Sequence, residues 1–167
     1  MRITPEFSVF DLIENESPSN IILSNTAHMI HFSRIIEQDI IHYQLPCTVY
    51  VGVQSLSHLV PIIDRYQQIA NIAKSVHILG VVSSPVPQSP DLNFVSLSPD
   101  SKLSREWFIV VNHPDFARVL SAREIGTSTD ESSERTFKAI LTSDYKIVEN
   151  VSSALAEYLH YRSKKSD

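Results

Sequence analysis

A chain of 167 residues with 43% hydrophobic and 20% charged residues is typical of one soluble globular domain. The net charge of −5 disfavours sequence-independent binding to nucleic acid, which needs a concentrated basic face. The three glycines, Gly52, Gly80 and Gly126, cannot form either of the common phosphate-binding loops, and no apolar run reaches the roughly 20 residues that cross a bilayer.

The N-terminus lacks the apolar core of a signal peptide, and Cys47 is the only cysteine, so we expect a cytoplasmic protein without an intrachain disulfide. We expect a single domain over residues 1–167. Within it, residues 1–20 are an N-terminal lead-in, residues 126–134 a mobile loop without apolar residues, and residues 162–167 a solvated tail.

The first predicted element is a short apolar piece from Phe7 to Ile13, followed by a polar connector over 14–20. Residues 21–43 are predicted to form one helix that ends before Pro46. Its apolar residues form a narrow stripe that suits packing on a sheet or pairing with a second copy of the helix. The stripe consists of Ile22, Met29, Ile36, Ile40 and Tyr43.

Short apolar runs rich in β-branched residues predict strands at 48–53, 76–82, 93–97 and 107–111. Between the first two, a helix is expected to begin near Pro61, because proline is tolerated at the first helical position. Its buried side is predicted to comprise Ile62, Ile63, Tyr66, Ile69 and Ala70.

After residue 111, Pro114 is predicted to open a helix that directs Phe116, Val119 and Leu120 inward. A strand is expected at 136–142, followed by a final helix capped by Ser143 or Asp144. The buried side of that last helix is predicted to comprise Val148, Val151, Leu155, Tyr158 and Leu159.

This order of elements predicts an α/β (α+β) fold, with a central mixed sheet of about five strands flanked by helices. The strands at 49–53, 76–82, 107–111 and 137–141 are expected to lie in the interior. No internal repeat is visible.

The stretch from Leu103 to Val111 combines an acid, the only tryptophan and a β-branched strand. With four other pieces of the chain, it resembles the DICT domain, a sensory module of bacterial diguanylate cyclases and two-component systems. The resemblance spans about Phe7 to Leu159. The five matching pieces are Arg65-Tyr66, Ile78-Leu-Gly-Val, Leu103-x-x-Glu-Trp-Phe-x-Val-Val111, Phe116-Ala-x-x-Leu-x-Ala-x-Glu124, and Arg135-x-Phe137 with Thr142.

The resemblance implies a sensory or interaction module that binds a small ligand or a partner signalling protein and is not an enzyme. Because the chain has little room for a second domain, we expect the output to come from a separate protein such as a histidine kinase, a cyclase or a response regulator. The two long helices also suggest a homodimer. No cofactor, nucleic acid or membrane is expected.

Glu106 and Arg135 each precede a core strand, and adjacent strands would bring them within ion-pair range. They either line a pocket for a polar ligand or form an ion pair that holds the sheet edge. The alternative function is a small hydrolase or transferase that uses Glu106 as its acid-base. Trp107 and Phe108 are expected to point to opposite faces of their strand, with at least one in the core.

Ligands of α/β proteins tend to bind at strand ends, so polar residues there are the candidate binding residues. Arg65 and Tyr66 are expected on the helix after the first strand instead, where Arg65 either binds a carboxylate or phosphate or lies over the sheet as a surface arginine. The predicted ligand- or partner-binding residues are Gln54, Arg65, Tyr66, Glu106, Trp107, Arg135 and Thr142.

Metal binding and covalent catalysis are weakly supported. His28 and His31 have a spacing that suits one metal ion, but His42 is too far along the same helix to be a third ligand, so exposed histidines are expected. Cys47 is expected to be a buried, inert thiol rather than a nucleophile or a tetrapyrrole anchor. We therefore predict no catalytic residue and no metal ligand.

Overall fold

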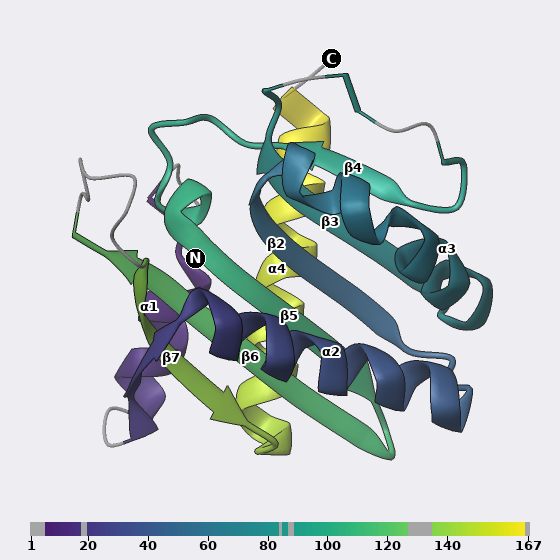
Figure 1. Cartoon of the computed structure of the whole chain (residues 1–167), viewed down its shortest axis with the longest axis horizontal. Helices are drawn as coiled ribbons and strands as arrows, with labels where there is room; N and C mark the ends of the chain where they lie inside the picture. The colour runs from purple at the N-terminus through teal and green to yellow at the C-terminus, as the bar shows by residue number, and fades with distance from the viewer. Residues whose placement is uncertain (1–5, 18–19, 84, 87–88, 127–134, 166–167) are drawn as a thin grey trace.

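A single seven-stranded sheet forms the centre of the molecule, in the strand order β1-β7-β6-β5-β2-β3-β4 (Figure 1). The computed structural model describes residues 6–17, 20–83, 85–86, 89–126 and 135–165. The strands are β1 (Ile22–Asn25), β2 (Thr48–Ser55), β3 (Ser75–Val81), β4 (Asn93–Ser96), β5 (Glu106–His113), β6 (Phe116–Ile125) and β7 (Thr136–Thr142). The helices are α1 (Val9–Glu16), α2 (Thr26–Tyr43), α3 (Ile63–Ile72) and α4 (Tyr145–Lys165), with short 3₁₀ helices η2 (Leu56–Ile62) and η3 (Lys102–Arg105).

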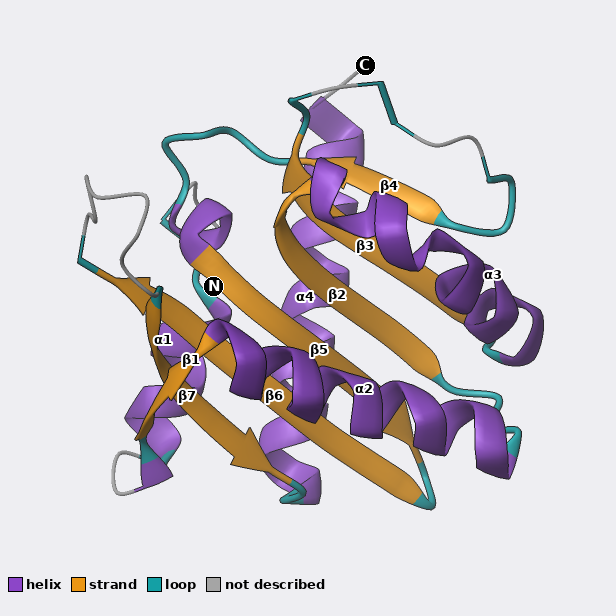
Figure 2. Ribbon diagram, viewed as in Figure 1, coloured by secondary structure: helices purple, strands orange, loops and turns teal. Residues whose placement is uncertain are grey.

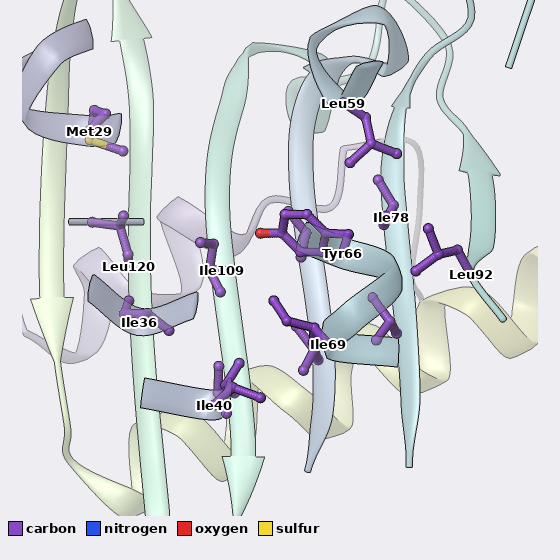
Figure 3. Packing of buried hydrophobic residues seen from close by; sticks show 14 of the residues in the cluster. Met29, Ile36, Ile40, Leu59, Tyr66, Ile69, Ile78, Leu92, Ile109 and Leu120 are labelled. Atoms are coloured by element: carbon purple, nitrogen blue, oxygen red, sulfur yellow. The ribbon is translucent and has the colours of Figure 1, made fainter. Parts of the chain in front are cut away.

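Helices cover both faces of this sheet (Figure 2). On one face α2 and α3 pack through Met29, Ile36, Ile40, Tyr66 and Ile69, which all belong to one hydrophobic cluster (Figure 3). On the other face α1 and α4 pack on a second, separate cluster. The predicted mixed α/β architecture is therefore confirmed, with seven strands in place of about five.

Strand β5 supplies both clusters because its side chains alternate between the two faces. Phe108 and Val110 belong to the cluster under α1 and α4, whereas Ile109 and Val111 belong to the cluster under α2 and α3. Trp107 packs on the α2–α3 side. The prediction that Trp107 and Phe108 point to opposite faces is thus confirmed.

The prediction of a helix after Pro114 is wrong, because residues 116–125 form the interior strand β6. The β5–β6 register pairs His113 with Phe116, so Pro114 and Asp115 form the turn of a hairpin. The sequence suggested a helix because Val119 and Leu120 are neighbouring apolar residues without alternation. Alternation is lost here because β6 is buried on both faces, with Val119 toward α4 and Leu120 toward α2.

The helix predicted from residue 21 begins later, since Ile22–Asn25 form the edge strand β1. Asn25 caps α2: its side-chain oxygen accepts a hydrogen bond from the backbone N–H of His28 at 2.9 Å. Within the predicted stripe only Met29, Ile36 and Ile40 are buried, and they lie against the protein's own sheet. The pairing of this helix with a second copy therefore cannot use the stripe, although a dimer through other surfaces stays a prediction.

The remaining predicted elements are present with small shifts. Pro61 lies inside η2, and α3 begins two residues later, with Tyr66 and Ile69 buried. The final helix is capped by Asp144, whose carboxylate accepts from the backbone N–H of Lys146 at 3.0 Å. Most of the predicted mobile loop at 126–134 lies outside the described residues, which end at Gly126 and resume at 135.

The strand directions decide which ends meet. Strands β2, β3 and β4 are parallel to one another, whereas β5, β6 and β7 alternate in direction next to β2. As a result, the ends of β2 and β6 lie at the same sheet edge as the beginnings of β5 and β7. We call this the Gln54 edge, after the polar residue that β2 carries there.

Candidate functional site

A cavity of about 410 Å³ lies between α2, η2 and α3, with strands β2 and β5 as its floor. Its floor is apolar, and polar side chains from the helices and from the Gln54 edge surround it. The floor comprises Val51, Val53, Trp107 and Ile109. The surrounding residues are Thr26, Ile30, Ser33, Arg34, Glu37, Ser57, His58, Pro61, Ile62, Arg65, Tyr66 and Arg135.

At one side of the cavity a buried carboxylate joins the two covering helices. Glu37 of α2 is 3% exposed, and its two oxygens accept from Arg65 Nη1 at 2.9 Å and from the Tyr66 hydroxyl at 2.5 Å. Figure 3 shows the Tyr66 hydroxyl directed from α3 toward the α2 side of the sheet. Burial raises the pKa of Glu37, while Tyr66 and Arg65 oppose this rise. The cluster therefore fixes the spacing of α2 and α3 at the cavity wall.

A second polar network stands at the Gln54 edge. Arg135 donates from Nε and Nη2 to the carboxylate of Glu124, at 3.1 and 2.8 Å, and also from Nη2 to the side-chain oxygen of Gln54. The amide of Gln54 in turn donates to Glu124 at 3.1 Å. Gln54 follows an irregularity in the β2–β3 register and has a φ of 66°, an uncommon conformation for a residue other than glycine. The three side chains thus hold one another at the cavity's end.

Hydrogen bonding from Arg135 holds the pKa of Glu124 below its ordinary value, with burial opposing the shift. A carboxylate with a lowered pKa in the folded state contributes stability above its unfolded-state value, and that contribution disappears as the pH falls through the folded-state pKa. Glu124→Gln is therefore expected to lower the melting temperature by roughly 1–3 °C at pH 7, and by less at pH 3.

Thermal melts of wild type and Glu124→Gln from pH 3 to 7 measure this difference. Glu157→Gln, at an exposed position of α4, is the matched control and should keep the wild-type melting temperature. A gap between Glu124→Gln and wild type that widens on acidification would contradict the assignment.

Trp107 forms part of the cavity floor, and its orientation is fixed from two sides. Its indole N–H donates to the Ser33 hydroxyl of α2 at 3.1 Å. Its ring meets the Phe137 ring edge-on, with the centroids 5.8 Å apart. Because Trp107 is the only tryptophan in the chain, its fluorescence reports on this cavity alone.

The predicted binding residues divide into three groups. Arg65, Tyr66, Trp107 and Arg135 line the cavity, and Gln54 supports Arg135 from beside it. Thr142 lies at the opposite sheet edge, because β7 starts at the Gln54 edge and runs away from it. There its hydroxyl accepts from the backbone N–H of Asp144 at 3.1 Å, at the start of α4.

Glu106 lies on the other face of the sheet, so the predicted proximity of Glu106 and Arg135 is wrong. Strand β6 separates their strands, and Arg135 packs on the α2–α3 side. Glu106 is fully buried, where its oxygens accept from the Ser8 hydroxyl at 2.6 Å and the Phe10 N–H at 2.9 Å. Arg123 Nη2 lies 3.6 Å from the Glu106 carboxylate. Burial raises the pKa of Glu106, against the hydrogen bonds from Ser8 and Phe10.

The chain matches the profile of a known protein family. The profile of the DICT family, described as a sensory domain in diguanylate cyclases and two-component systems, matches residues 8–125. The chain belongs to the DICT family. No curated protein and no solved structure matches it. The matched part of this DICT domain runs from the N-cap of α1 to the end of β6, and so includes every residue of the cavity lining except Arg135.

Several residues of the DICT domain's cavity were not predicted from sequence. Three of these residues lie on α2, for which the sequence indicated only an apolar stripe: Glu37, Arg34 and Ser33. A carboxylate directly after buried Ile36 was the available signal, because such an acid must find a donor if it is also buried. His58 lies at the cavity because it belongs to the 3₁₀ helix η2, an element that the sequence did not predict.

The other residues weighed for chemistry lie apart from the cavity. His28 and His31 are exposed, as expected, and within the described ranges no three His, Cys, Asp or Glu side chains are arranged to hold a metal ion. Cys47 is buried, and burial raises the pKa of its thiol to about 11, which suppresses the reactive thiolate. Among the helices of the described chain, none combines the length and the apolar character of a membrane span.

Proposed function

We propose that this DICT domain senses a small ligand, which it binds in the cavity between α2, α3 and the sheet. The observation that carries the proposal is the cavity itself, about 410 Å³ with an aromatic and aliphatic floor and convergent polar groups. Four of the seven residues predicted to bind a ligand from sequence line it. The family's sensory role supports the same reading.

The cavity also suits the transmission of a signal, because its walls belong to separate elements. Glu37 on α2 is held by Arg65 and Tyr66 on α3. A ligand that attracts Arg65 competes with Glu37 for the same guanidinium. Binding would therefore alter the contact between α2 and α3, which gives the bound and free states different helix packing.

Enzymatic use of Glu106 is the alternative, and its surroundings argue against it. Glu106 has no exposed surface, and both of its oxygens are occupied by donors from α1 and its N-cap. A general acid-base must reach a substrate proton, which this carboxylate cannot do without displacing α1. A turnover screen over ester, phosphoester and nucleotide substrates tests this; an activity abolished by Glu106→Gln in a folded protein would overturn the proposal.

A signalling partner is part of the same proposal. We infer that the domain couples to a histidine kinase, a cyclase or a response regulator, or to a second copy of itself. The edge strand β1 carries two exposed apolar residues, Ile22 and Leu23, and its outer side pairs with no other strand of the described residues. Light scattering at high micromolar concentration distinguishes a dimer from a monomer, and a monomer would remove the homodimer from the proposal.

A ligand that binds the native state raises the melting temperature by mass action. In a thermal-shift screen of nucleotides and signalling metabolites, we expect at least one compound to stabilise the wild type. That shift should be lost in Arg135→Ala, which removes a cation from the cavity lining. The ligand-free variant should also melt lower, because Glu124 and Gln54 lose their shared donor.

Arg118→Ala is the matched control, because Arg118 lies on β6 but outside this cavity. It should keep the full ligand shift. If Arg135→Ala lowers the melting temperature equally with and without every stabilising compound, Arg135 is structural and does not contribute to binding.

A further inference from the structure

The lining of the cavity is uneven in charge. It contains three arginines, Arg34, Arg65 and Arg135, against one carboxylate, that of Glu37, so its formal net charge is +2. The whole chain carries −5. The overall composition of the chain is acidic, so it does not account for three arginines around one cavity. The positive charge is therefore a specific feature of the cavity lining.

The carboxylate of the lining, that of Glu37, is bound by neighbouring side chains and is not available to a ligand. Both oxygens of Glu37 accept hydrogen bonds, from Arg65 and from Tyr66, and the side chain is 3% exposed. Glu124 lies outside the lining and is engaged by Arg135 and Gln54. A ligand in the cavity therefore meets cationic groups more readily than anionic ones.

The arginines also retain donors. Arg65 uses Nη1 for Glu37, and Arg135 uses Nε and Nη2 for Glu124 and Gln54. Arg34 is exposed, and among the described residues its side chain acts on the Glu37 carboxylate through its charge, without a hydrogen bond to it. A guanidinium binds carboxylate, sulfonate or phosphate oxygens in a fixed planar geometry, so these spare N–H groups suit an anion.

The floor of the cavity suits an apolar group, whereas the arginines suit an anion. Val51, Val53, Ile109 and Trp107 present aliphatic and aromatic surface, and the Trp107 N–H is already used by Ser33. Such a floor favours an apolar, preferably planar body. The floor and the arginines together define a ligand with two unlike parts.

We propose that the ligand of this cavity is a small amphipathic anion, with an apolar ring body on the β2–β5 floor and an acidic group among Arg34, Arg65 and Arg135. This inference rests on the proposed ligand-binding function and specifies the class of molecule. The anionic group attracts the cations, and the ring body replaces water over Trp107. A free inorganic anion or a neutral apolar molecule satisfies only half of the site.

Two dyes test the class directly, because they share one ring system. 8-Anilino-1-naphthalenesulfonate carries an acidic group, and N-phenyl-1-naphthylamine is the same body without it. We expect the sulfonate to bind with energy transfer from Trp107, and its Kd to rise about 5–10-fold in Arg34→Gln and at high salt. The neutral dye should bind more weakly and should not respond to either change. Arg118→Gln is the control, with no effect on either dye.

Ile30→Trp separates the class from the function. Because the new tryptophan would add its own energy transfer, binding to this variant is followed by the emission of each dye under direct excitation. Ile30 is 45% exposed at the cavity, so a larger side chain there obstructs the cavity without entering the core. If Ile30→Trp blocks both dyes but Arg34→Gln affects neither, a ligand site stands and the anionic class is overturned. If neither dye binds, or Ile30→Trp leaves both unchanged, the proposed ligand-binding function fails as well. Inorganic phosphate should not displace the sulfonate below high millimolar concentration, and displacement at lower concentration would contradict the role of the apolar floor.

Discussion

Replacing Glu106 with alanine is expected to lower the free energy of unfolding by about 4 kcal/mol, which is roughly a 10 °C fall in melting temperature for a domain of this size. The Ser8 hydroxyl and the Phe10 N–H would lose the acceptor that they share in this buried place, and Arg123 would lose a buried charge 3.6 Å away. Since these donors belong to α1 and its N-cap, α1 should detach first. Denaturant unfolding followed by circular dichroism measures the loss.

Glu106→Gln is the matched control, because it keeps one oxygen acceptor and removes the charge. Burial raises the pKa of Glu106, so the stability that this group contributes is fully present below its unfolded-state value and is lost as the pH rises through the folded-state value. The melting temperature of Glu106→Gln relative to wild type should therefore increase from pH 4 toward pH 7. A relative decrease over that range would show that the carboxylate is stabilised rather than penalised by its surroundings.

Gly52→Ala is expected to cost about 3 kcal/mol, for a reason of space rather than backbone conformation. A Cβ at Gly52 would lie 2.3 Å from Cε1 of Phe108, the residue paired with it across β2 and β5. Phe108 is fully buried under α1 and α4 and cannot move away freely. Thermal and denaturant unfolding of the variant measure the cost.

A second substitution identifies the cause. Phe108→Leu in the Gly52→Ala background removes the colliding ring atoms, so the double variant should be at least about 1 kcal/mol more stable than the sum of the single effects predicts. Gly126→Ala serves as the control, because its added Cβ meets no atom of the described residues within 4 Å. It should cost only about 1 kcal/mol, from its φ of 78°. Strictly additive effects of Gly52→Ala and Phe108→Leu would rule out the collision.

Sequence patterns correctly predicted those helices and strands whose buried side chains form a recognisable pattern of apolar residues. Strands β2, β3 and β5 are short β-branched runs, and the end of α2 and the cap of α4 follow from Pro46 and Asp144. Strand β6 was missed because a strand buried on both faces loses its alternation, and Val119 and Leu120 then resemble one turn of a helix.

That single error changed the predicted site. Without β6, the strands of Glu106 and Arg135 are neighbours and the two charges form an ion pair. With β6 between them, each residue finds a partner on β6 instead: Arg123 for Glu106 and Glu124 for Arg135. Which face a side chain occupies depends on register and strand order, and neither can be obtained from local composition. Residue type and strand-end position nevertheless identified Trp107 and Arg135 of the cavity lining, and the family resemblance identified Arg65 and Tyr66 on the helix.

The adjacent residues Arg123 and Glu124 make β6 unusually intolerant of a change in length. Arg123 donates to Ser8 and Asp11 on one side of the sheet, at 2.8 and 2.7 Å, and Glu124 accepts from Arg135 on the other. Deleting one residue between Ala117 and Ala122 would turn both side chains through the sheet, because alternate residues face opposite ways. The carboxylate would then enter the pocket of Glu106, and the guanidinium would face Arg135. Like charges would meet on both sides of the sheet at once, so two separate ion-pair arrangements depend on the spacing along this strand.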